Sequence, residues 1–292
     1  MSQHQINYET CTNCGLCVDI CPSLVYRWLA ERVEVDPANE SLCGWCAQCM
    51  SICPTEAVTV QGFAYGDFAP LAQDTADYEP LLALMRARRT CRRFTDEPIP
   101  QEALERILEA ARTAPMGMPP SIVEVVVING RDKVQELIPE LVRQTEWLGK
   151  ALKNPLWRLI LRRMVGRDMW PEFHKFASQY MEPMVKWYKE KGVDAFAWNC
   201  HAVLLFHAHR GGLCPQTDCD IACAYAMLAG EALGLGTGWN GMLQGGVDQS
   251  KQWKQRLGIP ERNKVYAALT LGYPAHKWAR GSPWKFKSVR WL

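Results

Sequence analysis

The sequence lacks an excess of charge of either sign, a long apolar run and an export signal. Its 33 lysines and arginines against 31 aspartates and glutamates leave a net charge of +2, so we expect no general attraction to nucleic acid. The longest apolar stretches, such as 122–128 and 202–206, fall far short of the ~20 residues that a helix needs to cross a bilayer. The first ten residues show no secretory pattern, and the sequence therefore predicts a soluble, cytoplasmic protein.

A disulfide framework is not expected either, although cysteine is abundant. Thirteen cysteines in a chain without an export signal favour metal ligation or redox chemistry. Eight of them lie within the first 53 residues, where the apolar stretches are too short for an independent core. We therefore expect a small front domain, residues 1–60, that bound metal stabilises.

This front domain contains two copies of one cysteine motif. The pattern C-x2-C-x2-C-x3-C-P begins at Cys11 and again at Cys43, and it is typical of bacterial ferredoxins with two 4Fe-4S clusters. Three closely spaced thiolates reach three irons of one cluster, and the fourth, after a longer gap and before a proline, reaches the other cluster. The predicted ligands are Cys11, Cys14, Cys17 and Cys53 for one cluster, and Cys43, Cys46, Cys49 and Cys21 for the other.

Zinc and disulfides are the alternatives for these eight cysteines. Zinc sites usually divide into two C-x2-C pairs separated by a spacer, which is not the spacing seen here. Four disulfides fit a reducing compartment less well still. Clusters of this type carry single electrons, so another group, held by the larger domain, must supply the bond chemistry.

Residues 61–79 are rich in Gly, Ala, Asp and Pro without periodicity and predict a linker, and residues 80–292 predict one domain of helices and strands. The order of its elements indicates a sheet sandwiched by helices. The expected elements are a short helix at 81–85, a helix from Pro100 to residue 111, a strand at 122–128 covered on both faces, a helical, tryptophan-rich region at 131–200, a strand at 201–209, a helix at 218–233 capped by Asp218, and a strand at 265–271.

Two segments of this domain resemble the nitroreductase-like FMN flavoproteins. RRTCRRFTDEPIP, with the following LERILEAARTAP, looks like their opening, and AGEALGLGTGWNGML resembles their later glycine-rich segment. With APMGMPPS and the cysteine motifs, the resemblance extends to the branch with a fused ferredoxin module and covers nearly all of the chain except about 131–200. It implies an α+β fold: a nitroreductase-like, FMN-binding α/β sandwich after a small ferredoxin-like domain. It also implies a homodimer with FMN in a cleft at the dimer interface.

The resemblance also implies the residues that hold FMN. By themselves, the arginines around Thr90 could equally form a solvated helix face. The resemblance instead places Arg88, Arg89, Thr90 and Arg92 at the phosphate, ribityl chain and pyrimidine, and the backbone N–H groups of Asn240, Gly241 and Met242 near flavin N5 and O4. The glycines could alternatively form only a helix end and a turn. No catalytic side chain is expected, because flavin N5 carries the chemistry.

Two departures from the family pattern bear on these contacts. The family's Asn-x-Gln-Pro-Trp segment is replaced by Pro-Pro-Ser-Ile-Val at 119–123, which lacks the side-chain amides. The family's Arg-Lys phosphate pair appears as Trp284 and Lys285. The further contacts predicted for the cofactor are Pro119, Ser121, Arg280 and Lys285.

The function implied is an FMN-dependent iron-sulfur oxidoreductase. Electrons from ferredoxin or another low-potential donor would pass through two 4Fe-4S clusters to FMN and on to a small aromatic or unsaturated substrate of the nitro, enone or quinone type. A reductive dehalogenase or dehydrogenase of the same fold, an electron-transfer subunit without its own substrate, and direct reduction by NAD(P)H remain alternatives.

Several aromatic residues, cysteines and histidines have no assigned role. The tryptophans of the 131–200 region predict either core or dimer packing, or a lid over the flavin: Trp147, Trp157, Trp170, Trp187 and Trp198. Core packing is favoured over a third metal site for the later cysteines: Cys200, Cys214, Cys219 and Cys223. His201, His207 and His209 lack an apparent carboxylate partner, so we expect no metal there.

Overall fold

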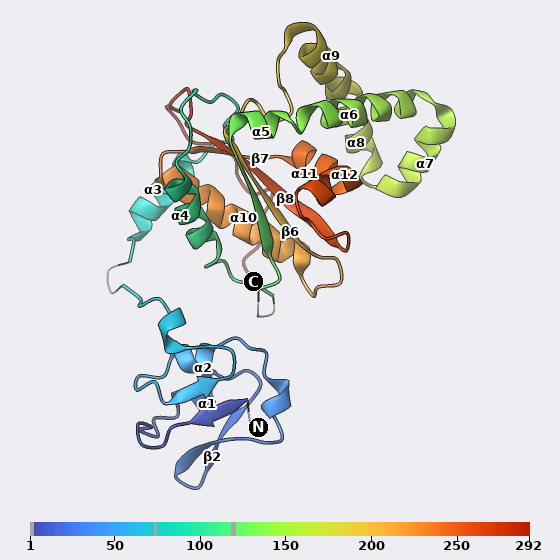
Figure 1. The fold of residues 1–292 in the computed structure, drawn as a ribbon. Helices are drawn as coiled ribbons and strands as arrows, with labels where there is room; N and C mark the ends of the chain where they lie inside the picture. Colours follow the sequence, from blue (N-terminus) through green and yellow to red (C-terminus); the bar gives the residue numbers. More distant parts are fainter. Residues whose placement is uncertain (1–2, 73–74, 118–120) are drawn as a thin grey trace. The chain divides into compact units, whose positions relative to one another are not determined.

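The computed structural model describes residues 3–72, 75–117 and 121–292, which form two compact units (Figure 1). The front unit is Met1–Ala76 with Met116–Ser121, and the large unit is Asp77–Pro115 with Ile122–Leu292. Within the described ranges no helix combines the length and the apolar character needed to cross a membrane.

The front unit contains two short helices, one in each cysteine motif, and two antiparallel pairs of strands. Each motif helix begins after a residue with left-handed backbone, Gly15 (φ 77°) and Ala47 (φ 56°). A side chain at Gly15 would in addition lie 2.6 Å from the Trp28 ring. The elements are β1 (His4–Ile6) paired with β4 (Val58–Val60), β2 (Tyr26–Leu29) paired with β3 (Arg32–Val35), the helices α1 (Leu16–Ile20) and α2 (Gln48–Ser51), and the 3-10 turn η1 (Glu40–Leu42).

The core of the front unit is small and includes residues from the expected linker. Phe63, Tyr65 and Phe68 pack against the buried cluster of this unit, and Tyr65 lies in the 3-10 turn η2 (Tyr65–Asp67). The Tyr65 hydroxyl donates to the Val58 carbonyl at 2.7 Å. Since the unit has few apolar residues, these aromatic rings add burial that the cysteine motifs do not supply.

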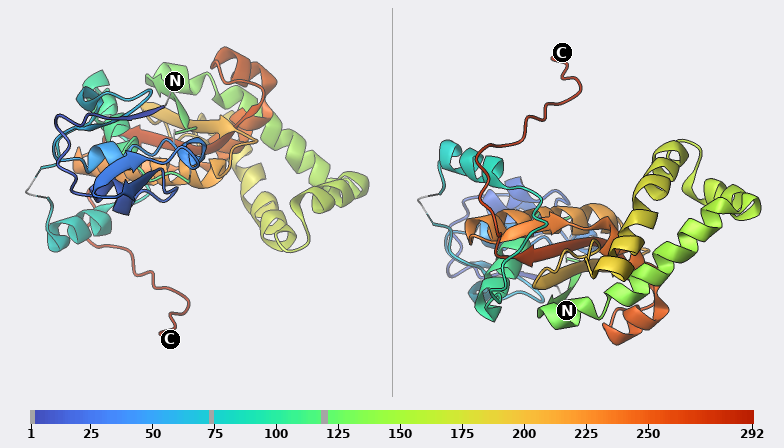
Figure 2. Two further views of the ribbon diagram at one scale, coloured as in Figure 1. Left: turned by 90° about the horizontal axis from the view of Figure 1, so that it is seen from below. Right: turned by 90° about the horizontal axis from the view of Figure 1, so that it is seen from above.

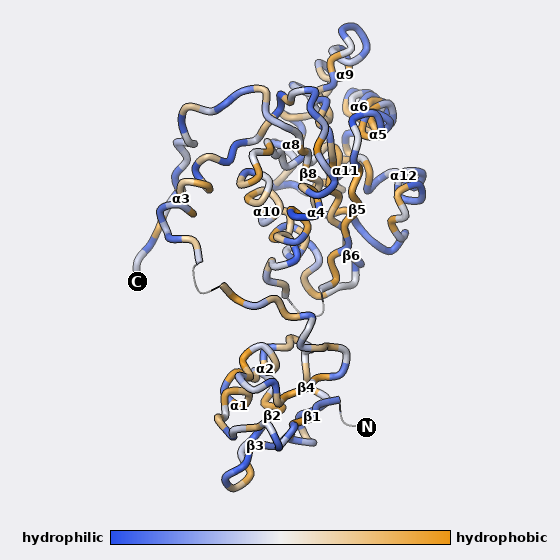
Figure 3. The backbone as a smooth tube through the Cα atoms, turned by 60° about the vertical axis from the view of Figure 1, so that its left-hand side comes forward, coloured by the Kyte–Doolittle hydropathy of each residue, from blue (hydrophilic) through white to orange (hydrophobic). Residues whose placement is uncertain are grey.

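The large unit is built on an antiparallel four-stranded sheet in the order β5-β6-β8-β7. Hydrophobic residues, orange in Figure 3, gather in its strands. The strands are β5 (Glu124–Asn129), β6 (Ala202–His209), β8 (Asn263–Gly272) and β7 (Gly236–Trp239).

Helices cover both faces of this sheet, as the element order indicated. The even-numbered residues of β6 pack with α4 and α10, and its Val203 and Leu205 pack with α6, α11 and α12. The short helix α3 precedes these elements. Their bounds are α3 (Tyr78–Ala87), α4 (Gln101–Ala111), α6 (Ile138–Lys153), α10 (Pro215–Ala232), α11 (Gly241–Gln249) and α12 (Lys251–Arg256).

Three local features differ from the sequence prediction. β5 is an edge strand, and its Val127 is 37% exposed, so helices do not cover both of its faces completely. α10 begins at Pro215, and Asp218 is buried inside its first turn, so it does not cap the helix. The strand β7 was not expected from its glycine-rich sequence. This strand requires glycine at two positions. A Cβ at Gly236 would lie 2.7 Å from the Cys91 side chain, and a Cβ at Gly238 would lie 2.9 Å from the Thr270 hydroxyl.

The tryptophan-rich region forms a helical excursion from the large unit. Figure 1 shows α6 to α9 projecting beyond the sheet, and Figure 2 shows the segment after β8 running away from the body of this unit. The excursion is introduced by α5 (Arg131–Gln135). It continues after α6 with α7 (Pro155–Val165), α8 (Trp170–Phe176), the π-helical turn η3 (Ala177–Met181) and α9 (Glu182–Lys191).

Candidate functional site

The front unit gathers its eight motif cysteines into two groups of four. One small cavity is lined by Cys11, Cys14, Cys17 and Cys53. A second cavity, of about 200 Å³, is lined by Cys21, Cys43, Cys46 and Cys49. The fourth cysteine of each motif therefore joins the first three of the other motif, which is the crossed arrangement that the spacing predicts.

Each group of four thiols combines cysteines of both motifs, which is the grouping expected for a pair of clusters. Within the described ranges, no group of three or more His, Cys, Asp or Glu side chains is placed to hold a single metal ion. A zinc ion would require four thiolates within about 2.3 Å of one centre. A cubane cluster takes each thiolate at a separate iron, so its ligands stand further apart than those of a single zinc ion.

Hydrogen bonds to the sulfurs follow the internal repeat. The Val25 N–H donates to Cys21 Sγ at 3.3 Å, and the Ala57 N–H donates to Cys53 Sγ at 3.2 Å. Side-chain bonds do not follow the repeat, and the shortest of them is from the buried Tyr26 hydroxyl, which donates to Cys49 Sγ at 3.4 Å. Such donors stabilise negative charge on cluster sulfurs and thereby affect the reduction potential.

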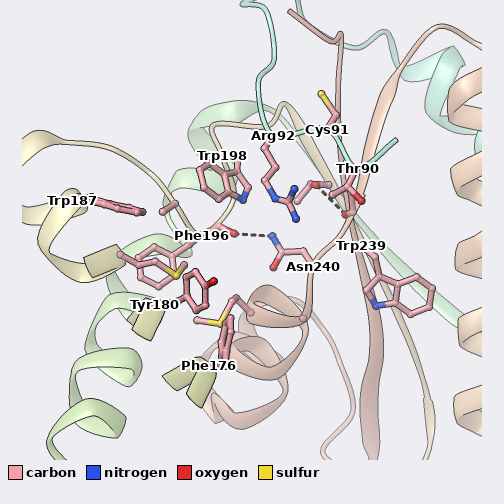
Figure 4. A pocket seen from close by; sticks show the side chains of 16 residues that line it. Thr90, Cys91, Arg92, Phe176, Tyr180, Trp187, Phe196, Trp198, Trp239 and Asn240 are labelled. Carbon is pink, nitrogen blue, oxygen red and sulfur yellow. Dashed lines mark hydrogen bonds between the residues drawn. The ribbon is translucent and has the colours of Figure 1, made fainter. Parts of the chain in front are cut away.

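The large unit contains a cavity of about 460 Å³ in which several predicted cofactor contacts meet (Figure 4). Of the predicted residues, Thr90, Arg92, Asn240, Gly241 and Met242 line it. The remaining wall comes from the loop 195–198, from Trp239 and Thr270, and from aromatic residues of the helical excursion.

The arginine-rich segment reaches this cavity because it runs along β7. The Cys91 N–H donates to the Thr237 carbonyl at 2.8 Å, and Thr90 forms a parallel bridge with Thr237. Figure 4 shows the Arg92 side chain directed into the cavity. This segment therefore presents one cation to the cavity, which is what an anionic or electron-rich ligand needs.

The two neighbouring arginines lie outside the cavity wall. Arg88 follows the end of α3, and its Nη1 is buried without a hydrogen-bond partner in the described part of the chain. The Arg89 guanidinium lies 5.6 Å from the centre of the Trp278 ring. Burial raises the pKa of Glu231, and the charge of Arg88 opposes that rise. A buried guanidinium nitrogen without an acceptor is expected to bind an anion.

The N-terminus of α11 supplies the other polar part of the cavity. The Asn240 N–H already donates to the Ala268 carbonyl at 2.8 Å, so it is not a donor toward a ligand as predicted. The Asn240 side chain caps the helix by accepting from the Leu243 N–H at 2.9 Å. The Gly241 and Met242 N–H groups have no acceptor among the described residues. Because the first N–H groups of a helix attract negative charge, these two remain the candidate donors.

Asp194 shapes the opposite wall, and the sequence analysis missed it. Its buried carboxylate accepts from the backbone N–H groups of Phe196 and Ala197, at 2.8 and 2.9 Å, and from that of Asn199 at 2.9 Å. The loop so held places Trp198 at the cavity with a left-handed backbone, φ 59°. The Phe196 carbonyl in turn accepts from Asn240 Nδ2 at 2.7 Å, which joins this loop to α11 (Figure 4).

The helical excursion adds an aromatic wall. Phe176 and Tyr180 stack with their ring centres 5.6 Å apart, at the π-helical turn η3, and both line the cavity. Of the five tryptophans without an assigned role, Trp187 and Trp198 also line it. Trp147 and Trp157 instead contact each other edge to face at 5.4 Å.

Besides Arg88 and Arg89, three further predicted contacts do not line this cavity. Ser121, Arg280 and Lys285 are not among its lining residues, and Pro119 lies outside the described residues. Arg280 and Lys285 belong to the exposed segment after β8, which forms no helix or strand. The later cysteines behave mainly as core: Cys200, Cys219 and Cys223 are fully buried in the two cores of the large unit.

Curated relatives match two thirds of the chain at low identity. The FMN reductase (NAD(P)H) of Bacillus subtilis is 25% identical over 66% of this chain and 65% of its own length. A putative NADH dehydrogenase/NAD(P)H nitroreductase of Archaeoglobus fulgidus is 24% identical over 67% of this chain and 86% of its own length. The iodotyrosine deiodinase of Danio rerio is 24% identical over 68% of this chain and 61% of its own length.

Solved structures and family models agree on the fold. A nitroreductase with bound FMN from Bacteroides fragilis superposes with a TM-score of 0.55 at 20% identity, over 73% of this chain and 98% of that one. The model described as 4Fe-4S binding domain matches residues 4–26, and the model of the nitroreductase family matches residues 85–273, more than half of the chain. The chain is therefore an oxidoreductase of the nitroreductase family that carries a 4Fe-4S binding domain ahead of the family domain.

Proposed function

We propose that this chain is an FMN-dependent reductase that receives single electrons from ferredoxin or a similar low-potential donor through two 4Fe-4S clusters. The observation that carries this proposal is the presence, in one chain, of two crossed groups of four cysteines and of a cavity lined by Arg92 and the α11 N-terminus. We further propose a cytoplasmic location, where the ligand cysteines stay reduced.

The cavity in the large unit fits FMN by the chemistry of its donors. Inside the cavity, Arg92 with Thr90 is the candidate for the polar edge of the ring and the ribityl chain. The candidate for the phosphate is Arg88, which lies outside the cavity wall and whose Nη1 has no hydrogen-bond partner among the described residues. The open N–H groups of Gly241 and Met242 suit the electron-rich side of a flavin, and an added Cβ at Gly241 would meet no atom within 4 Å. When bound, FMN supplies the two-electron chemistry at N5.

The protein side chains then bind, orient and exclude water. Asn240 and Asp194 fix the two backbone segments that face each other across the cavity. Aromatic residues line the rest of the cavity and offer few polar partners: Phe176, Tyr180 and Trp187, with Trp198 beside Arg92 (Figure 4). We therefore propose a flat, aromatic or unsaturated substrate of the nitro, enone or quinone type, stacked against this wall.

Reductive dehalogenation is the second candidate reaction. The iodotyrosine deiodinase of Danio rerio is among the relatives, matched over 68% of this chain. Turnover of nitroaromatics, enones, quinones and halophenols by the same anaerobic preparation separates the two reactions. A preparation with full cofactor content that turns over none of these compounds would favour an electron-transfer subunit.

We also propose that two copies of the chain associate. The segment after β8 exposes large apolar side chains without a neighbour in the described part of its own chain: Trp284, Phe286, Val289 and Trp291. Such side chains need a surface to cover them. Light scattering of the intact protein, which should give twice the chain mass, tests this.

The cofactor proposal is tested by anaerobic purification. We expect about eight irons per chain and one flavin. To identify the donor, flavin reduction is followed with reduced ferredoxin and with NAD(P)H, in the native protein and in Cys14→Ser. If Cys14→Ser loses the reaction with ferredoxin but keeps the reaction with NAD(P)H, the cluster route is supported. If both proteins are reduced at equal rates and NAD(P)H is the better donor, the cluster route is refuted. A preparation with neither iron nor flavin refutes the whole proposal.

A further inference from the structure

The helix α7 (Pro155–Val165) exposes an apolar stripe that nothing in its own unit covers. Leu156 is 66% exposed, Leu159 64% and Met164 77%, and Ile160 lies between them. Their positions i, i+3, i+4 and i+8 place them along one side of the helix. Leu161 is the one buried residue of α7, and it anchors the helix to the small core formed with α6 and η3.

This helix is well formed even though its exposed side lacks a neighbour. Pro155 occupies its first position, and the Asn154 side chain accepts from the N–H groups of Leu156 and Trp157 at 2.9 and 3.2 Å. Such a cap sets the start of a helix without tertiary contacts. The stripe is therefore presented on an ordered element, at the end of the excursion away from the sheet (Figure 1).

The charge of this helix is of one sign. Arg158, Arg162, Arg163 and Arg167 lie between residues 154 and 167, which contain no acidic residue. None of these four arginines forms an ion pair with another described residue. The chain as a whole carries a net charge of only +2, so the positive charge of this helix is a local property.

We propose that α7 docks onto the surface of an anionic lipid bilayer. At 100° per residue, Arg162 flanks this stripe, Arg163 lies within it, and Arg158 lies on the other side of the helix. A stripe of this kind, with an exposed tryptophan at its start, suits a helix in the headgroup region, where leucine and methionine enter the acyl boundary and the long arginine side chains reach the phosphates. Trp157, 43% exposed, supplies that tryptophan. The helix is about 16 Å long at 1.5 Å per residue, which suits lying on a bilayer and not spanning it.

A second copy of this chain is a less suitable occupant of the same stripe. In a two-fold interface whose axis passes through the stripe, α7 would meet the α7 of the partner. Two helices with three arginines each and no acidic residue would then repel each other, whereas anionic headgroups neutralise the same charge. Docking of α7 does not depend on the proposed reaction.

Cosedimentation of the intact, cofactor-loaded protein with vesicles tests the proposal. Vesicles of phosphatidylcholine with one third phosphatidylglycerol are compared with vesicles of phosphatidylcholine alone. We expect binding to the anionic vesicles, and a loss of at least about tenfold in both Leu159→Ser/Met164→Ser and Arg158→Gln/Arg162→Gln. Leu71→Ser and Arg290→Gln are the matched controls, because they remove one exposed apolar and one exposed cationic side chain elsewhere.

The remaining outcomes decide against the proposal. Absence of binding to anionic vesicles, or binding that the α7 variants leave unchanged, overturns it. A change of oligomeric state in the α7 variants shows that a second copy covers the stripe, and this also overturns it. The substituted side chains are exposed, so we expect the variants to fold. Iron and flavin contents equal to those of the native protein establish that they do. Their activity toward a water-soluble acceptor should equal that of the native protein.

Discussion

The hydroxyl of Tyr26 is expected to set the two proposed clusters apart in reduction potential. Its ring is 2% exposed, and its hydroxyl donates to Cys49 Sγ at 3.4 Å. In the other group, Cys53 has two hydroxyl neighbours, Thr55 Oγ1 at 3.9 Å and the less buried Tyr65, whose hydroxyl donates to the Val58 carbonyl. A hydrogen bond to a cluster sulfur stabilises the reduced, more negative state. Replacing Tyr26 with Phe should therefore lower the potential of the cluster held by the Cys49 group.

The size of this shift follows from the strength of one hydrogen bond. A single intramolecular hydrogen bond contributes about 0.5–1.5 kcal/mol net. For a one-electron couple, about 59 mV corresponds to 1.4 kcal/mol. Tyr26→Phe should thus make one cluster more negative by roughly 20–60 mV, and it should leave the other cluster unchanged.

An anaerobic redox titration followed by electron paramagnetic resonance measures this shift. Tyr8→Phe serves as the control, because Tyr8 lies in the same unit, and its ring lies under the Arg32 guanidinium and makes no hydrogen bond to a thiol. Unchanged potentials in Tyr26→Phe, or an equal shift of both clusters, would contradict the role assigned to this hydroxyl. A positive shift would show that the O–H group stabilises the oxidised state.

Three further predictions concern the loop, the first cysteine group and acid stability. Asp194→Ala leaves three backbone N–H groups without their acceptor, so we expect a loss of about 3–5 kcal/mol in urea unfolding and a raised KM, with Asp194→Asn in between. Unchanged stability in Asp194→Ala would refute this. Cys53→Ser should reduce the iron content from about eight to about four per chain and leave the flavin bound; loss of the flavin as well would contradict independent sites. Burial lowers the pKa of His207 in the folded chain. As the pH falls below the ordinary histidine pKa of about 6.5, this side chain therefore takes up a proton in the unfolded chain but not in the folded chain. Stability should therefore fall as the pH drops below about 6.5, and less steeply in His207→Asn, as the melting temperature measured against pH would show; equal slopes would exclude this histidine.

The features that could be predicted from the sequence are those that depend on short-range spacing. The cysteine interval fixes which thiols can reach a common centre, so the crossed grouping with Cys53 and Cys21 follows from eight positions alone. Helix α4 shows its buried face through Leu104, Ile107 and Ala111. These patterns depend on neighbours a few residues apart, and no knowledge of the tertiary structure is needed to read them.

Features that depend on tertiary neighbours could not be predicted. The apolar sequence of β5 is equally compatible with a central and an edge strand, and only the strand order shows that it is an edge. The sequence predicts that the Asn240 N–H can donate to a ligand, but in the structure it donates to the Ala268 carbonyl of β8. Asp194 precedes an apolar stretch and could be recognised as a turn residue, but its role is to fix the wall opposite α11, which lies more than 40 residues away.

The two sides of the large cavity therefore differ in whether their contacts come from sequence motifs or from the tertiary structure. On the side proposed for the cofactor, the donors are backbone N–H groups and arginine, and they require only a glycine-rich helix start and a basic segment, which recur as recognisable motifs. On the other side the contacts are aromatic side chains of the excursion, placed by the π-helical turn at Phe176 and Tyr180 and by the Asp194 loop.

A substitution on the first side should impair every substrate equally, because it acts on the common cofactor. A substitution on the second side, such as Tyr180→Leu, should instead change the ratio of kcat/KM between a flat aromatic and a small aliphatic acceptor. A uniform loss across both acceptors would show that the aromatic wall supports the cofactor and not the substrate.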